Sequence, residues 1–298
     1  MSSGVLILAG ATASGKTALA VELAIQFDAE IVGADSRQIY RGMPIGTAAP
    51  SPEQLAAVPH HLIGFLDPYD RYSAAMYAAD ALAAIMDIRS RRKRAIVCGG
   101  TGFYIRALIG SVSLSPQYDQ ALRDRLAREA RLHEPAFLHA WLASRDSRRA
   151  AALPPNDRYR VLRALEVTLA TTRHPQSCER TLRAENVDCA LVFLDVAVPE
   201  LDVRISTRAA RMLAEGFVDE AERVGNAAVA ANAVGYPYAL AYLRGLSTRG
   251  ELRSLLERAT RRYARRQRTW FRGEPEALWL QPADVRAVAR EKLGWVPK

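Results

Sequence analysis

Cysteine is scarce in this chain of 298 residues, which holds only Cys98, Cys178 and Cys189. Their number is odd, they lie far apart, and none forms a Cys-x-x-Cys pair. The sequence therefore argues against a disulfide framework and against a structural zinc site. Such cysteine usage is typical of a reducing compartment, so a cytoplasmic location is expected.

Long apolar runs are also missing. No stretch approaches the ~20 residues that a membrane-spanning helix needs. The apolar run near the N-terminus is short and has no basic flank, which argues against a signal peptide. Repeats and low-complexity segments are absent from the sequence. With 49% hydrophobic and 24% charged residues, the composition predicts a globular protein with no membrane partner, long enough for one domain with an insertion.

Lysine is the second residue type in short supply. Of 41 basic residues only Lys16, Lys93, Lys292 and Lys298 are lysine, and the rest are arginine. Residues 201–298 hold 18 basic and 11 acidic groups, so most of the net charge of +9 lies there. Arginine binds phosphate through two parallel hydrogen bonds and stacks on bases. A polyanionic partner is predicted; a solvated arginine-rich surface is the alternative.

What the sequence does contain is a P-loop close to its start. The apolar run Val5–Ala9 predicts a buried strand that breaks into Gly10-x-x-x-x-Gly15-Lys16-Thr17, and a helical spacing of apolar residues begins at Leu19. The glycines let backbone N–H groups face phosphate oxygens, Lys16 adds charge, and the Thr17 hydroxyl can coordinate Mg²⁺. This nucleotide-binding signature, common in ATP-binding proteins, predicts phosphate contacts from Gly10, Thr12, Ala13, Ser14, Gly15, Lys16 and Thr17.

Two more strands end in polar residues. Glu30–Gly33 is followed by Asp35, and Ala95–Cys98 runs into Gly99-Gly100-Thr101-Gly102. Strands alternating with helical stretches indicate a parallel sheet covered on both faces, with ligands bound beyond the carboxyl ends of its strands. The P-loop, Asp35 and Thr101 are therefore expected to meet along one edge. The stretch from Gly42 to Pro59, rich in Gly, Pro and Ser, is predicted to be a loop.

The middle of the chain changes character. From residue 115 to about residue 185 it is rich in Arg, Ala, Leu and Glu at helical spacing and shows no convincing strand, before Cys189–Leu194 resumes the sheet. The predicted fold is α/β: a P-loop NTPase-like parallel sheet flanked by helices, with an all-helical insertion domain. The predicted domains are a core of residues 1–114 plus 186–298 and an insertion of residues 115–185. The remaining predicted elements are helices at Tyr72–Arg89 with Ser73 as N-cap, Pro199–Val224, Tyr236–Leu243 and Glu251–Phe271, a strand at Leu278–Leu280, and a last helix from Pro282.

Several single residues stay open on pattern alone. Asp35 and Asp195 each close an apolar strand, and either could order magnesium. Asp35 follows the P-loop unit, where an acid can face a transferred group, whereas a strand-end cap is the alternative for Asp195. Arg204 and Arg208 lie four residues apart and could reach the P-loop phosphates from one helix face. The pair His60-His61 lacks a third ligand, so a structural or loop role is expected and not a metal site.

The segment from Arg261 to Arg272 is the most basic part of the chain. It holds six arginines and three aromatic residues in twelve positions, with no acidic residue. Such a segment suits a polyanion, with aromatic residues stacking on bases or packing in the core. For Trp270 and Phe271 core packing is the favoured interpretation.

The motifs together resemble the tRNA dimethylallyltransferase family. The resemblance rests on Gly10–Thr17, Asp35-Ser36-Arg37-Gln38-Ile39-Tyr40, Gly99–Tyr104, Arg163-Ala164-Leu165-Glu166-Val167, Val234-Gly235-Tyr236 and the Tyr263–Arg272 block, in the family's order over nearly the whole chain. The chain departs from the family's usual residues at Ala11, Gly64, Tyr159 and Pro237-Tyr238.

The resemblance implies a transfer of a dimethylallyl group from dimethylallyl diphosphate to N6 of adenosine 37, beside the tRNA anticodon. The P-loop would then hold a diphosphate leaving group rather than ATP, with Mg²⁺ on Thr17 and with Arg208 as the arginine of the site. Asp35 would accept the proton of the amine and Thr101 would steer the leaving group, as general-base and electrostatic roles. The adenine would leave its stack to react.

By the same resemblance, one insertion and one basic helix would grip the anticodon stem-loop, and a monomer is expected. The implied tRNA contacts are Asp35, Ser36, Arg37, Gln38, Thr101, Arg123, Tyr159, Arg160, Val161, Leu162, Arg163, Gly235, Tyr236, Arg265 and Arg266. Three other functions stay open: prenyl transfer to a free adenine nucleotide, a small-molecule kinase with Asp195 on magnesium, and a non-catalytic RNA-binding protein.

Overall fold

The structure is a computed structural model that describes residues 4–112, 120–170, 180–227 and 232–298. The chain divides into two compact units, residues 1–112 with 180–298, and residues 113–179. Residues 180–185, expected in the insertion, pack in the first unit because Leu182 is fully buried there and its backbone N–H bonds to Leu108 O at 2.9 Å. Cys98 and Cys189 are free thiols, and Cys178 lies outside the described residues.

The first unit is built on a six-stranded sheet in the order β3-β2-β4-β1-β5-β6, with every described pair parallel. Its central strand β1 pairs through Leu6 with Ile96 on one side and with Ala190 on the other. The predicted α/β class is confirmed. The strands are β1 (Val5–Gly10), β2 (Ala29–Gly33), β3 (His60–His61), β4 (Arg94–Gly99), β5 (Cys189–Leu194) and β6 (Leu278–Leu280).

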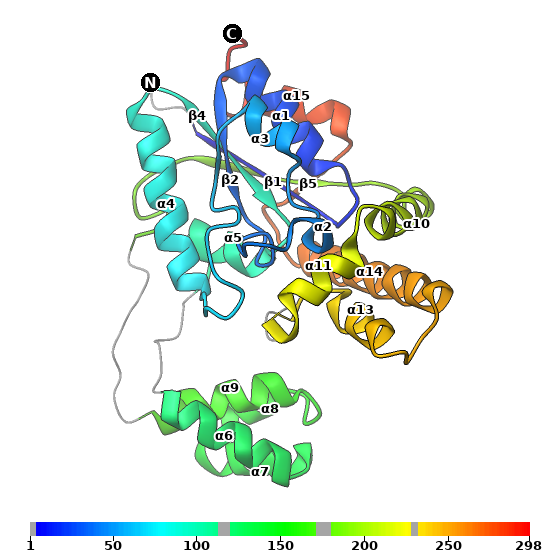
Figure 1. Cartoon of the computed structure of the whole chain (residues 1–298). Helices are drawn as coiled ribbons and strands as arrows, with labels where there is room; N and C mark the ends of the chain where they lie inside the picture. The colour runs from blue at the N-terminus through cyan, green and yellow to red at the C-terminus, as the bar shows by residue number, and fades with distance from the viewer. Residues whose placement is uncertain (1–3, 113–119, 171–179, 228–231) are drawn as a thin grey trace. The chain divides into compact units, whose positions relative to one another are not determined.

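Helices cover both faces of this sheet (Figure 1). Alternate residues of β1 point to opposite sides: Ile7 packs in a core with α4 (Ala74–Ser90), α5 (Gly102–Ile109) and α14 (Arg249–Arg272). Leu6 and Leu8 pack in a second core with α1 (Lys16–Phe27) and α15 (Val285–Glu291). Because both faces are buried, each central strand is a continuous apolar run instead of an alternating one.

A third apolar cluster lies beside the carboxyl ends of the strands. It is formed by the segment after β2, by α10 (Val198–Ala214), α11 (Phe217–Val224) and α13 (Tyr236–Leu243), and by the first half of α14. The helix predicted over 199–224 is in fact two, because Gly216 adopts φ 92° and breaks it. A short 3₁₀ turn, Pro282–Asp284, precedes α15.

The stretch predicted as a loop, residues 42–59, contains two short helices, α2 (Pro44–Thr47) and α3 (Pro52–Ala57). Helix α3 has a complete capping box, in which the Ser51 hydroxyl and the Gln54 side chain accept each other's backbone N–H groups, and Pro52 stands in the first turn. Since proline and serine also favour helix starts, a loop was the wrong interpretation here.

The histidine pair forms strand β3, which the sequence did not predict. His61 Nε2 lies 2.8 Å from the Glu30 carboxylate, and His60 Nδ1 lies 2.9 Å from Val58 O. The expected structural role is confirmed. Among the residues that the structure describes, no three metal-binding side chains gather into a group, and no helix is both long and apolar enough to span a membrane.

The second unit, in its described part, consists of helices packed around their own apolar core. Leu126, Leu138, Leu142, Val161 and Leu165 form the centre of that core. Its helical character agrees with the prediction. The helices are α6 (Gln120–Leu132), α7 (Pro135–Arg145), α8 (Ser147–Ala151) and α9 (Arg158–Leu169).

Candidate active site

The three loops expected to meet do meet at the carboxyl end of the sheet, because β2, β4 and β1 are neighbours in it. The loop after β2 is fixed to that after β4 by bonds from Ala34 N to Cys98 O, 2.8 Å, and from Thr101 N to Ala34 O, 3.1 Å. Gly99 is required here, since a Cβ on it would lie 2.1 Å from Ala34 O. The Gly99–Gly102 motif thus allows two backbones to touch.

The P-loop has the geometry of an anion cradle. Gly15 adopts φ 87°, and α1 begins at Lys16, so the helix N-terminus points to the loop's mouth. Lys16 Nζ donates to Ala11 O at 3.2 Å, and burial lowers the pKa of its ammonium group. The Ser14 hydroxyl oxygen is buried and has no partner among the described residues. A buried hydroxyl without a partner is available to donate a hydrogen bond to a phosphate oxygen.

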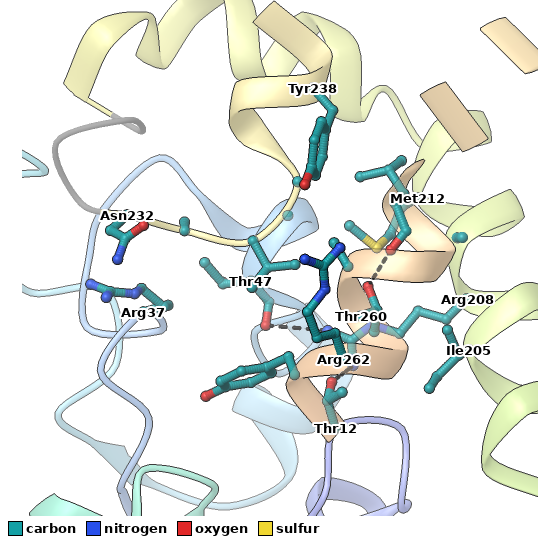
Figure 2. Close-up of a pocket in the computed structure, with 18 of the residues that line it drawn as sticks. Thr12, Arg37, Thr47, Ile205, Arg208, Met212, Asn232, Tyr238, Thr260 and Arg262 are labelled. Atoms are coloured by element: carbon teal, nitrogen blue, oxygen red, sulfur yellow. Dashed lines mark hydrogen bonds between the residues drawn. The ribbon is translucent and has the colours of Figure 1, made fainter. Parts of the chain in front are cut away.

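Helix α10 brings two arginines to the cradle. Arg208 donates to Thr12 Oγ1 at 3.2 Å and to Thr47 O at 3.5 Å, bonds that Figure 2 marks as dashed lines. Burial lowers the pKa of its guanidinium to about 10, so it remains a cation at neutral pH. Arg204 donates to Ser14 O at 3.1 Å and also pairs with Glu200. The expected reach of this helix face to the P-loop is confirmed.

Asp35 and Thr101 lie beside each other, with their loops hydrogen-bonded. The Thr101 hydroxyl accepts from Ser36 N at 2.9 Å and donates to Ser36 Oγ at 3.3 Å. Asp35 Oδ1 accepts from Arg37 N at 2.9 Å, which fixes its carboxylate. The Gln38 amide does not bond to this pair; it donates to Thr47 O and Ala48 O at 3.2 and 2.9 Å. It holds α2 in place.

Of these groups, Thr12, Asp35, Ser36, Arg37, Thr47 and Arg208 border one cavity of about 590 Å³, within the range for small-molecule sites. Thr12, Asp35 and Arg208 form its polar side. An apolar wall and three arginines line the rest of the cavity. Figure 2 shows Met212 and Ile205 on the opposite side from Arg37. The apolar wall comprises Ile205, Ala209, Met212, Val234 and Leu256, and the arginines are Arg37, Arg262 and Arg266.

Helix α14 closes the cavity next to Asp35. Tyr263 lines it, and burial together with the nearby Asp35 carboxylate raises the pKa of its phenol. The Arg266 guanidinium stands 5.7 Å from the Tyr263 ring centre, and Arg265 is exposed. Phe271 is fully buried and Trp270 packs against the core, so their predicted core role is confirmed.

Asp195, the rival carboxylate, has a different partner. It pairs with Arg268 at 3.0 Å and is not among the residues that border the cavity in the described part of the chain. Asp35 borders it and its charge acts on Lys16 and on Arg208. Of the two acids that the sequence left open, Asp35 therefore has the position for chemistry.

Tyr236 does not present its side chain as the sequence suggested. Its ring is fully buried and its hydroxyl donates to Glu220 Oε1 at 2.6 Å, whereas Gly235, with φ 103°, borders the cavity. A tRNA contact by the Tyr236 side chain is therefore wrong for this structure; the ring supports the cavity wall.

The second unit presents its implied tRNA contacts unequally. Tyr159 is 81% exposed, whereas the Val161 side chain is fully buried in the core and cannot reach a ligand. Arg123 and Arg163 both pair with the buried Glu166 carboxylate, and Arg160 pairs with Asp157 at 3.0 Å. The partly buried Leu162 packs against the same core. Tyr159 and Arg160 are the accessible members of the group.

For a divalent ion the P-loop supplies the Thr17 hydroxyl, partly exposed in the first turn of α1. Mg²⁺ keeps several waters and needs only one or two protein ligands when phosphates supply the rest. The residues present therefore fit Mg²⁺ held jointly with a diphosphate.

Sequence reasoning missed part of the cavity. Thr47, Met212, Tyr238, Thr260 and Arg262 border it, and no sequence pattern assigns them a role. Arg262 is visible in the sequence only as part of the basic segment. The others carry no local signal, because they meet only through contacts between segments far apart in sequence.

The fold and the site define a P-loop α/β protein whose cavity places a carboxylate beside an anion cradle. The model of the IPP transferase family matches residues 38–274. The chain is 45% identical over 292 residues to a tRNA dimethylallyltransferase of Geobacter sulfurreducens, covering 95% of this chain and 94% of that one. It is 46% identical over 296 residues to a namesake from Anaeromyxobacter sp. (strain K), covering 97% and 96%.

Solved structures agree. The full-length tRNA isopentenylpyrophosphate transferase of Bacillus halodurans matches with a TM-score of 0.69 at 31% identity, covering 98% of this chain and 96% of that one. This chain belongs to the IPP transferase family.

Proposed function

We propose that the chain transfers a dimethylallyl group from dimethylallyl diphosphate to N6 of adenosine 37 in tRNA, releasing diphosphate. One observation carries the proposal: Thr12 of the anion cradle with its partner Arg208, the Asp35 carboxylate and an apolar wall border the same cavity. The relatives' name supplies the substrates, and the cavity supplies a place for each chemical part of them.

The leaving group is a diphosphate that gains negative charge as its bond to carbon breaks. Lys16 and Arg208 would lie beside the place where this charge develops, with the N-terminus of α1 pointing to it. Preorganised donors in a water-poor site stabilise such charge far more than they do in water. Mg²⁺, held by Thr17 and phosphate oxygens, would add further positive charge. The apolar wall of Ile205 and Met212 suits the alkyl tail.

The nucleophile is an exocyclic amine that must lose a proton. The N6 nitrogen attacks C1 of the allyl group, the C1–O bond breaks with its electron pair leaving on diphosphate, and the amine proton passes to the Asp35 carboxylate. A base within hydrogen-bonding reach of its proton contributes typically about 10²–10⁴-fold. Thr101, whose hydroxyl borders Asp35's loop, would contact the leaving oxygens or the base.

For the RNA, we propose contacts from two surfaces. In the first unit Ser36, Arg37, Gly235 and Arg266 border the cavity, and the exposed Arg265 adjoins Arg266 in the chain. In the second, the exposed Tyr159 and Arg160 suit a base and a phosphate. Arg123, Arg163 and Gln38 would act mainly by holding these surfaces. We further propose a monomer that works in the cytoplasm, where tRNA is modified.

The decisive experiment is mass analysis of an anticodon stem-loop incubated with the protein, dimethylallyl diphosphate and Mg²⁺. A gain of one C₅H₈ unit on adenosine 37 is expected. The matched control is the same stem-loop with inosine at position 37, which lacks the N6 amine and must stay unmodified. Transfer to AMP with none to the stem-loop would reassign the acceptor, and hydrolysis of ATP dependent on Lys16 would replace the proposal with a kinase.

A further inference from the structure

A single buried amide connects helix α14 to the site. The Gln267 side chain, 5% exposed, accepts the backbone N–H of Thr12 on Oε1 at 2.8 Å and donates from Nε2 to Gly100 O at 3.0 Å. Thr12 belongs to the P-loop and Gly100 immediately precedes Thr101. Two loops that carry different parts of the site are thus held by the two ends of one planar group.

The fit around this amide is close. A Cβ on Gly100 would lie 2.1 Å from Gln267 Nε2, so glycine is required there for the amide to approach. On the other side, the Thr12 hydroxyl oxygen accepts a hydrogen bond from the Arg208 guanidinium at 3.2 Å. The amide, the P-loop and the arginine of α10 therefore form a continuous chain of hydrogen bonds.

The amide has a polarity that few side chains could replace. One end must accept and the other must donate, and both partners are backbone groups. A carboxylate of the same shape could accept from Thr12 N but would face Gly100 O with a lone pair, which is repulsive. The bonds are made out of contact with water, where an unmatched polar group is costly.

We propose that Gln267 is a positioning residue that sets the spacing between the diphosphate cradle and the loop of Thr101. The proposal rests on the function proposed above. Gln267 does not border the cavity and does not touch a substrate; it acts through Thr12 and Gly100. An amide that only filled the core would contribute to stability without changing how the cradle binds an anion.

The test compares Gln267→Glu and Gln267→Met with the unchanged protein. In Gln267→Glu the ionised carboxylate loses the bond to Gly100, so kcat should fall by about 10- to 100-fold at about pH 8. Lowering the pH to about 5.5 protonates that buried carboxyl, which then donates to Gly100 O and accepts from Thr12 N. The kcat of Gln267→Glu divided by the kcat of the unchanged protein should therefore rise at least about fivefold as the pH falls. Gln267→Met, which cannot titrate, should show a lower kcat and a ratio that does not change with pH.

Two further measurements separate positioning from mere packing. Calorimetric titration with inorganic pyrophosphate should show a Kd raised about tenfold or more in both variants, whereas the Kd for the stem-loop should change less than about twofold. Gln281→Glu is the matched control, because Gln281 also donates to a backbone carbonyl, Asp195 O at 2.7 Å, away from the cavity; its kcat and pyrophosphate Kd should stay as they are.

Opposite outcomes are clear. A Gln267→Met variant with unchanged kcat and unchanged pyrophosphate affinity would overturn the proposal, as would a Gln267→Glu ratio flat with pH. An unchanged protein that binds pyrophosphate but transfers no prenyl group would overturn the proposed function alone. If Gln267→Glu does not fold, as judged by its Tm, the Met variant still decides.

Discussion

The hydroxyl of Thr101 accepts the backbone N–H of Ser36 at 2.9 Å, which fixes the loop after β4 to the loop after β2. Asp35 precedes Ser36, and its carboxylate accepts a hydrogen bond from the backbone N–H of Arg37. The carboxylate and the hydroxyl are thus set by two adjacent backbone bonds and not by side-chain packing alone. The pair is a rigid element on which the proposed proton transfer and leaving-group control both depend.

We expect Asp35→Asn and Thr101→Ala each to lower kcat by more than about 100-fold, the scale set by removing a general base or an oxyanion donor. Single-turnover transfer to the stem-loop measures the change. Asp67→Asn is a matched control, because Asp67 also accepts the N–H two residues ahead, Tyr69 N at 3.0 Å, outside the cavity. Near-normal rates in both site variants would remove the assigned roles.

The edge of the sheet was predictable because each of its polar motifs directly follows an apolar run. Lys16, Asp35 and Thr101 need only local pattern and the rule that parallel strands end together. The opposite wall was not predictable, since Met212, Tyr238 and Thr260 come from helices that meet only in the folded chain. The sequence also could not show that Tyr236 is turned inward, because its partner Glu220 lies on another helix.

Arg208 should matter for the diphosphate more than any exposed arginine of its helix. We expect Arg208→Ala to weaken pyrophosphate binding by about 10- to 100-fold, the value of one charge-assisted hydrogen bond. Arg208→Lys should recover only part, because lysine keeps the charge but not the planar fork. Calorimetry measures both. Arg211→Ala, an exposed arginine on the same helix paired with Glu215, is the control; equal losses in the two alanine variants would contradict the assignment.

The basic face of α14 should make stem-loop binding depend on salt concentration. The double variant Arg265→Ala with Arg266→Ala should weaken stem-loop binding, and the slope of log K against log salt should become shallower by about 0.7 to 0.9 for each phosphate that is no longer neutralised. Filter binding over a salt series gives the slope. Arg286→Ala with Arg290→Ala removes two exposed arginines from α15 and should leave the slope unchanged. Identical slopes for all three proteins would exclude α14 as an RNA-binding helix.

Glu30 should govern part of the acid stability. Its side chain is 2% exposed, and the hydrogen bond from Arg91 is the main cause that lowers its pKa from 4.5 to about 2. Because the folded-state pKa is depressed, the stabilisation is complete above pH about 4.5 and is lost as the pH falls toward about 2. Since Arg91 is 42% exposed, solvent screening reduces this stabilisation.

The comparison of unchanged protein with Glu30→Gln isolates this effect. The difference in unfolding free energy, from urea titrations, should be constant from about pH 7 to about pH 5 and should shrink below that. Glu22→Gln, at an exposed ion pair with Arg286, should show almost no difference at any pH. A Glu30 difference that grows on acidification would have the wrong sign for a depressed pKa.

Glu220 should be the most sensitive position behind the cavity. It is fully buried and accepts three donors: Ile45 N at 2.9 Å, Gly46 N at 2.7 Å and the Tyr236 hydroxyl at 2.6 Å. Replacing it with alanine leaves those donors without partners and opens a void, so we expect about 3 kcal/mol of destabilisation. Tyr236→Phe removes one donor together with its hydrogen bond and should cost only about 1 kcal/mol.

Replacing Glu220 with alanine should also alter the cavity, because Glu220 anchors the start of α2. Gly46 and Thr47 of that helix border the site. Urea unfolding gives the stability, and the Kd for pyrophosphate reports the cavity through Thr47, whose carbonyl accepts Arg208. A Glu220→Ala protein should therefore bind pyrophosphate more weakly even at temperatures where it is folded, whereas Tyr236→Phe should bind it normally. If Glu220→Ala cost less than Tyr236→Phe, the carboxylate would not be the group that anchors α2.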